Sequence, residues 1–137
     1  MTTEAEKQKK IDGIEINFNG DTELPRLNSE TIEEFGFEDK PVLLKKNIIE
    51  KNLNNHPEVD PSDYKEIIGN SLYKPDIVLH GGGNKPYYNF ISMTGEDKNA
   101  ISLLQVENTN SGNFEIINMY WINNRGKSRK ERRKDKA

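Results

Sequence analysis

The stretch HGGGNKPYYNF, from His80 to Phe90, collects side chains that can do acid–base chemistry on a phosphate. Histidine exchanges protons near neutral pH, lysine supplies positive charge, and tyrosine can donate a hydrogen bond or stack on an unpaired base. Three consecutive glycines also let backbone N–H groups approach a ligand, although the strand, helix and Lys-Ser/Thr context of a phosphate-binding P-loop is missing. The same glycines suit a plain hairpin connection, so the spacing leaves both interpretations open.

Other chemistries lack their residues in this sequence. The chain has no cysteine, which excludes disulfides, thiolate catalysis and cysteine-ligated zinc. The two histidines, His56 and His80, do not form a zinc motif, and neither an HExxH nor a GxSxG pattern occurs. We therefore expect no metal and no cofactor, and the remaining reaction class is metal-independent chemistry on a phosphate.

RNA cleavage is the reaction that needs only these residue types. A base takes the proton of the 2′-hydroxyl, an acid protonates the departing 5′-oxygen, and fixed cations stabilise the charge that builds on the phosphate. A sheet that presents His80, Lys85, Tyr87 or Tyr88, Tyr120 and Arg125 would bring the required groups together.

Charge is distributed very unevenly along the chain. Residues 123–137 hold eight Lys/Arg against two acidic residues, a net +6, so the other 122 residues carry −9 of the total −3. A basic arm of this kind is an electrostatic footprint for nucleic acid, although a solvated tail explains it as well.

Length and composition predict one small domain. With 137 residues, 32% hydrophobic and 31% charged, the chain can build a single modest core. No apolar run approaches the roughly 18 residues of a membrane span, and no signal peptide is visible, so we expect a soluble, cytoplasmic protein. The expected organisation is a disordered segment over 1–10, one α+β domain over 11–125 and a basic tail over 126–137.

Helices and strands separate along the sequence. Alternation over 14–18 predicts a short strand, and a second one is expected over 40–44. Apolar spacing and capping residues predict helices over 29–36, 46–56 and 60–72, with Asp60 as N-cap and Pro61 at the first helical position. Four further strands are expected over 75–80, 87–93, 99–107 and 113–122. Helices followed by consecutive strands favour an α+β fold in which short helices pack on a four-stranded antiparallel twisted sheet.

Neighbouring aromatic residues on the expected strands must face opposite ways. One residue of the Tyr87–Tyr88 pair should therefore reach the core and the other the open face. By the same alternation we expect Trp121 in the core with Met119 and Ile117, and Tyr120 on the other face.

Several short motifs, in the right order, resemble the phage-associated nucleases grouped with barnase, EndoU, colicin-type tRNases and RelE toxins. The matching pieces span residues 30–133, and the best of them are Gly36 through Leu44, Lys51 with His56-Pro57-Glu58, Asp63-Tyr64 and Pro75-Asp76-Ile77-Val78. The stretches NKPYYNFIS, ISLLQVEN and FEIINMYWINNRGKSRKER resemble the remaining strands and basic close of that group.

The resemblance implies a barnase/RelE-like metal-independent endoribonuclease, acting as a toxin or phage effector on tRNA, rRNA or mRNA. Active residues of the group vary among His, Lys, Arg, Tyr, Ser and Thr. The resemblance aligns Lys85 and Tyr87 with the basic and aromatic start of the group's second strand, and Tyr120, Arg125 and Ser128 with the end of its last strand, so we assign these five residues to catalysis. His80 joins this catalytic set on its chemistry and not on the resemblance. We assign substrate binding to a second set: Tyr88, Asn89, Lys127 and Arg129.

Three functional interpretations remain on sequence alone. The first is the ribonuclease, and the second is a non-catalytic RNA-binding or phage accessory module of the same fold. The third is a protein-interaction domain whose basic tail binds an acidic partner such as an immunity protein or antitoxin. For His56 we expect a structural role at the C-terminal end of its helix.

Overall fold

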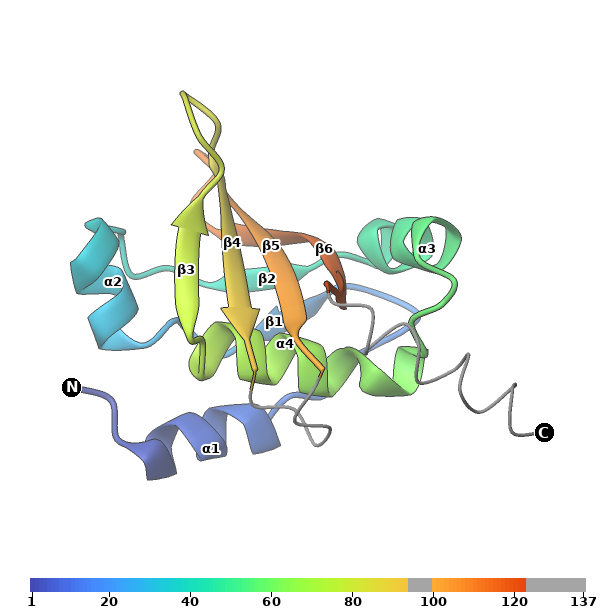
Figure 1. The fold of residues 1–137 in the computed structure, drawn as a ribbon, viewed down its shortest axis with the longest axis horizontal. Helices are drawn as coiled ribbons and strands as arrows, with labels where there is room; N and C mark the ends of the chain where they lie inside the picture. Colours follow the sequence, from blue (N-terminus) through green and yellow to red (C-terminus); the bar gives the residue numbers. More distant parts are fainter. Residues whose placement is uncertain (94–99, 123–137) are drawn as a thin grey trace.

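The computed structural model describes residues 1–93 and 100–122 as four α-helices, one short 3₁₀-helix and six strands (Figure 1). In chain order they are α1 (Glu4–Asp12), β1 (Thr22–Leu24), α2 (Ser29–Phe35), β2 (Val42–Leu44), α3 (Lys46–Asn55), the 3₁₀-helix (Pro61–Asp63), α4 (Tyr64–Tyr73), β3 (Ile77–His80), β4 (Tyr87–Ser92), β5 (Ser102–Asn108) and β6 (Phe114–Trp121). The fold class is therefore α+β, with the helical half before the meander, as the sequence predicts.

The sheet is larger than the expected four-stranded one. Its order is β1-β2-β6-β5-β4-β3, and the last four strands form the predicted antiparallel meander. The two short strands β1 and β2 extend it beyond β6, and β2 runs parallel to β6, which makes a six-stranded mixed sheet. The strand predicted over 40–44 is present as β2. Its pairing with β6 was not predicted, because Val42 and its partner Phe114 are some seventy residues apart, and β1 was not predicted either.

Helix α4 packs across one face of the sheet and supplies much of the core. Its side chains Tyr64, Ile67, Ile68 and Leu72 are fully buried, as its apolar spacing predicts. In Figure 1, α1 lies beyond α4, α2 lies beside β3, and α3 lies beyond β6. The opposite face of the sheet, called the open face below, carries Tyr87, Asn89 and Tyr120.

Residues 1–10, expected to be disordered, instead lie largely in α1. A capping box begins this helix: the Glu6 N–H donates to Thr3 Oγ1 at 3.1 Å, and the Thr3 N–H donates to Glu6 Oε1 at 3.3 Å. Ile11 at its end is buried against Gly69 of α4, where an added Cβ would lie only 2.8 Å from the Ile11 side chain. The predicted strand over 14–18 is absent, and the chain turns there before β1.

An irregularity in the β5–β6 pairing changes which residues of β6 face the core. The register shifts at Gln105/Val106, which makes Val106 pair with Ile116 and Gln105 with Asn118, so Ile117 is left over. Trp121 and Met119 are buried as expected, but Ile116 takes the core position predicted for Ile117, which is only half-buried. Strict alternation failed here because a bulge adds one residue to one strand.

Candidate active site at the α3–β6 corner

The glycine-rich stretch forms the tip of the β3–β4 hairpin. Gly82 and Gly83 have positive φ angles of 90° and 58°, which side-chain-bearing residues rarely adopt. The Gly81 N–H donates to the Tyr87 carbonyl at 2.8 Å and the Lys85 N–H to the Gly82 carbonyl at 3.2 Å. The glycines therefore serve the turn geometry, which is the plainer of the two sequence interpretations.

His80 is engaged in closing this hairpin. Its Nε2 atom lies 2.6 Å from the Lys85 carbonyl oxygen, and its ring lies 4.9 Å from that of Tyr88. Tyr88 in turn packs edge-on against Phe37 of the core at 4.9 Å. Tyr88 is thus the tyrosine that reaches the core, and His80 shares its side of the sheet.

The other hairpin residues of the predicted site point elsewhere. Tyr87 and Asn89 lie on the open face, opposite Glu107 and Gln105 of β5, so the sheet separates them from the His80 ring. The backbone of Lys85 belongs to the exposed loop. The structure therefore does not bring His80 and Tyr87 together around one substrate position.

Tyr120 lies in a different region, on β6. Tyr120 pairs with Leu103 of β5, whereas Tyr88 pairs with Val106 of β5 and with His80 of β3. Tyr120 therefore lies at a different height along the strands from Tyr88 and His80, and on the other face of the sheet. Its nearest aromatic neighbour is His56, just after α3: the rings stack at 4.4 Å between centroids with 12° between planes.

His56 is held from a second side by a carboxylate. Its Nδ1 atom lies 3.3 Å from Glu58 Oε2, and the two side chains are 25% and 33% exposed. A proton on Nδ1 donated to this carboxylate leaves the Nε2 lone pair available as a base, the orientation that a histidine needs for proton transfer. The backbone N–H of His56 ends α3 by donating to the Asn52 carbonyl at 2.8 Å, so the expected structural role involves the backbone while the ring is directed to Glu58 and Tyr120.

Asn52 fixes α3 against β6, beyond the two residues of β6 that pair with β2. Its Nδ2 donates to the Met119 carbonyl at 3.0 Å, and its Oδ1 accepts the Met119 N–H at 3.1 Å. Asn52 Nδ2 also approaches the hydroxyl of Tyr64 at 3.3 Å, and burial raises the pKa of that phenol. The buried Asn52 amide thus makes the hydrogen bonds to Met119 that a neighbouring strand would otherwise make. It also fixes the end of α3, which His56 follows.

Sequence reasoning missed the pairing of His56 with Tyr120 and the role of Asn52. A signal existed, because Ile49, Asn52 and His56 share one helical face at i, i+3 and i+7. A polar residue on an apolar face indicates a buried hydrogen-bonding partner, but the sequence does not reveal which strand provides it.

The remaining predicted residues lie outside the described part of the chain. Arg125 and Ser128 of the catalytic set, and Lys127 and Arg129 of the substrate-binding set, belong to residues 123–137. Described β6 ends at Trp121, one residue after Tyr120, and the sequence continues into that basic segment.

Neither a metal site nor a membrane helix is found among the residues that the structure describes. No group of three or more histidine, aspartate or glutamate side chains is placed to hold an ion there. Within the same residues, every helix is too short or too polar to cross a bilayer.

Comparison with known proteins identifies the family of the chain. No curated protein and no solved structure matches it. A sequence model of the family described as large polyvalent protein-associated domain 13 matches residues 13–134, which include β1 to β6 and leave out α1. Since this match covers most of the chain, the protein belongs to the large polyvalent protein-associated domain 13 family.

Proposed function

We propose that this domain is a metal-independent endoribonuclease whose reacting groups gather at the α3–β6 corner, defined by His56, Glu58 and Tyr120. The observation that carries the proposal is the placing of the His56 imidazole between the Glu58 carboxylate and the Tyr120 ring. This arrangement lies where the chain leads into the basic segment 123–137.

His56 is the proton-transfer group in this proposal. Its Nε2 takes the proton from a 2′-hydroxyl, the 2′-oxygen bonds to phosphorus, and the bond from phosphorus to the 5′-oxygen breaks. The products are a 2′,3′-cyclic phosphate and a free 5′-hydroxyl, whose proton comes from an acid. Glu58 orients the imidazole and stabilises its protonated form, as the carboxylate of a triad does.

Tyr120 and the basic segment supply the remaining needs of the reaction. The Tyr120 ring holds the imidazole by stacking, and its hydroxyl is suited to donate to a phosphate oxygen. Arg125, and the hydroxyl of Ser128, follow Tyr120 closely in sequence and suit the charged and polar contacts to the phosphate. The hairpin residues His80, Lys85, Tyr87, Tyr88 and Asn89 become peripheral in this proposal.

A second candidate is a non-catalytic RNA-binding module. The charge distribution favours it, because eight cations within fifteen residues bind phosphates without any proton transfer. In that case the His56–Glu58 pair only fixes the turn between α3 and α4.

Cleavage of purified tRNA and rRNA in EDTA distinguishes the two candidates. We expect wild type to leave 2′,3′-cyclic phosphates, His56→Ala to lower the rate by about 10²- to 10⁴-fold, and His80→Ala to keep it within about twofold. His80→Ala is the matched control because it removes the same ring from the other end of the sheet. Glu58→Gln should reduce the rate while RNA binding stays unchanged, since it alters orientation and not charge contacts to RNA.

Two outcomes would contradict the nuclease proposal. Intact RNA with salt-sensitive binding would establish the non-catalytic module instead. Cleavage lost in His80→Ala but kept in His56→Ala would move the site back to the hairpin. Circular dichroism and thermal unfolding of each variant show whether a lost activity reflects a lost fold.

A further inference from the structure

The outer edge of β3 is open in the described structure. β3 is the last strand of the sheet and pairs only with β4 among the described strands. The Gly81 N–H donates to the Tyr87 carbonyl, so these two residues form a hydrogen-bonded pair. Hydrogen-bonded and non-hydrogen-bonded pairs alternate along an antiparallel ladder, so Leu79 and Ile77 are the next residues of β3 that bond to β4. This alternation directs the backbone N–H and C=O groups of Val78 and His80 away from β4.

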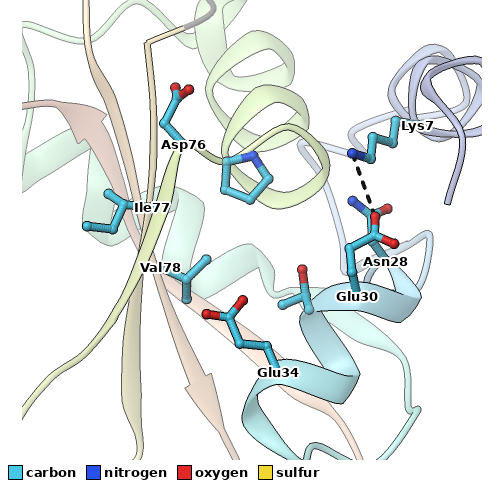
Figure 2. Close-up of a pocket in the computed structure, with 9 residues that line it drawn as sticks. Lys7, Asn28, Glu30, Glu34, Asp76, Ile77 and Val78 are labelled. Carbon is cyan, nitrogen blue, oxygen red and sulfur yellow. Dashed lines mark ion pairs between the residues drawn. The ribbon is translucent and has the colours of Figure 1, made fainter. Parts of the chain in front are cut away.

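Two chemically different surfaces flank this edge. On the open face, Ile77 and Leu79 are each 46% exposed, which is high for aliphatic side chains in a strand. On the core side, a hollow of about 260 Å³ separates β3 from α2. Figure 2 shows the Glu34 carboxylate of α2 directed toward Val78 across this hollow.

The hollow is acidic and only partly neutralised. Glu30 forms an ion pair with Lys7 at 3.6 Å, and the Thr2 N–H, which donates to its carboxylate at 2.8 Å, lowers the pKa of Glu30. Asp76 accepts the Met93 N–H at 2.6 Å. Glu34 is exposed and its carboxylate is the one aimed at the strand edge, so a cation beside Val78 would meet a carboxylate of α2.

We propose that the β3 edge binds an extended segment of another protein in which basic and apolar side chains alternate. Such a segment would lie about 4.8 Å from β3 and accept and donate hydrogen bonds at Val78 and His80. Its side chains opposite Val78 and His80 lie on the core side of the sheet, where Val78 lines the hollow, and carry the positive charge. Those opposite Ile77 and Leu79 point to the open face and are apolar.

The basic partner proposed for the β3 edge has the opposite charge to the acidic or phosphate-bearing partner expected from the sequence. The basic segment 123–137 favours an acidic or phosphate-bearing partner, whereas the β3 edge favours a basic one. The inference does not depend on the proposed nuclease activity, because it uses a different edge of the sheet and none of the α3–β6 corner residues.

The test measures binding of a labelled seven-residue peptide, in which lysine and valine alternate, to the full-length chain by fluorescence anisotropy. Glu34→Lys should weaken this binding by about tenfold or more, since it places like charges opposite one another. Glu33→Lys is the matched control: it makes the same charge change on the neighbouring exposed residue of α2, which does not line the hollow, and it should change Kd by less than about twofold.

A second peptide separates strand addition from charge attraction alone. Methylating the backbone nitrogen of every residue keeps the charge and the side chains but removes all N–H donors of the peptide and with them the strand pairing. The methylated peptide should not bind, and the unmethylated peptide should slow amide exchange at Val78 and His80. Absence of binding by the unmethylated peptide, equal binding of both peptides, or equal weakening by the Glu33 and Glu34 variants would overturn the proposal.

Discussion

The two histidines of this chain show how the same side chain is used in two different settings. His80 ends a strand at a glycine-rich turn, is exposed, and directs Nε2 to a backbone carbonyl of its own hairpin. His56 follows a helix, is half-buried, and is held between a carboxylate and a stacked aromatic ring from another element. One ring closes the turn of its own hairpin, while the other is fixed against a side chain of a distant strand.

The difference arises from what lies behind each histidine. Behind His56, the buried Asn52 ties α3 to the backbone of β6, so residues distant in sequence are fixed relative to one another. Behind His80 there is a turn whose glycines adopt positive φ angles and whose tip residues are exposed. Reacting groups need positions defined to a fraction of an ångström, and packed elements provide this better than a loop.

The largest expected effect comes from breaking the support of the α3–β6 corner. Asn52→Ala leaves the buried N–H and C=O of Met119 without partners, and each costs about 1–3 kcal/mol. We therefore expect the free energy of unfolding in urea to fall by about 2–4 kcal/mol. Asn55→Ala, an exposed change on the same helix, should cost less than about 0.5 kcal/mol. Equal effects of the two variants would show that Asn52 does not hold the corner.

Alkaline pH should distinguish the two ends of α4, which begins at Tyr64 under the α3–β6 corner and ends at Tyr73 before β3. Burial raises the pKa of both phenols above the usual value, most strongly for Tyr73, while the Asn52 hydrogen bond partly opposes the shift at Tyr64. A raised folded-state pKa means that the folded chain keeps a proton that the unfolded chain loses. Stability is thus fully present below about pH 10 and is lost above it, by up to about 1.4 kcal/mol per pH unit for each group.

The corresponding measurement is urea unfolding between pH 8 and 11 for wild type, Tyr73→Phe and Tyr64→Phe. Tyr73→Phe should flatten the alkaline loss of stability more than Tyr64→Phe does. The slope against pH is the readout, because removal of the Tyr73 hydrogen bond to the Pro25 carbonyl lowers stability at every pH. A larger flattening in Tyr64→Phe would reverse the assignment.

The parts of the fold that sequence predicts are those set by local chemistry. The Asp60 side chain accepts the Ser62 N–H, with Pro61 following at the first position, as the capping pattern indicates. The meander of β3 to β6 follows from turn residues between β-rich runs. The parallel pairing of β2 with β6 and the bulge at Ile117 depend on contacts between distant segments, for which periodicity gives no signal.

The same division applies to the candidate site. Residue types identified His80, Lys85, Tyr87 and Tyr120 as able to act on a phosphate, but their types do not determine whether they converge. His56 and Tyr120 are sixty-four residues apart, and only the docking of α3 on β6 makes them neighbours. The first ten residues were expected to be disordered, whereas a capping box begins α1 and Ile11 at its end is buried.

The smallest expected effect comes from the hairpin tip. Gly82→Ala places a side chain at a φ of 90°, which costs about 1–2 kcal/mol, although no atom blocks the added methyl group. Because the hairpin is peripheral to the proposed chemistry, the cost should appear in the urea midpoint while RNA cleavage stays within about twofold of wild type. A Gly13→Ala variant, at a φ of −81° in the αR region, serves as the unstrained control. If Gly82→Ala instead removed cleavage without altering stability, the hairpin would be part of the site, and the contrast between the two histidines would no longer hold.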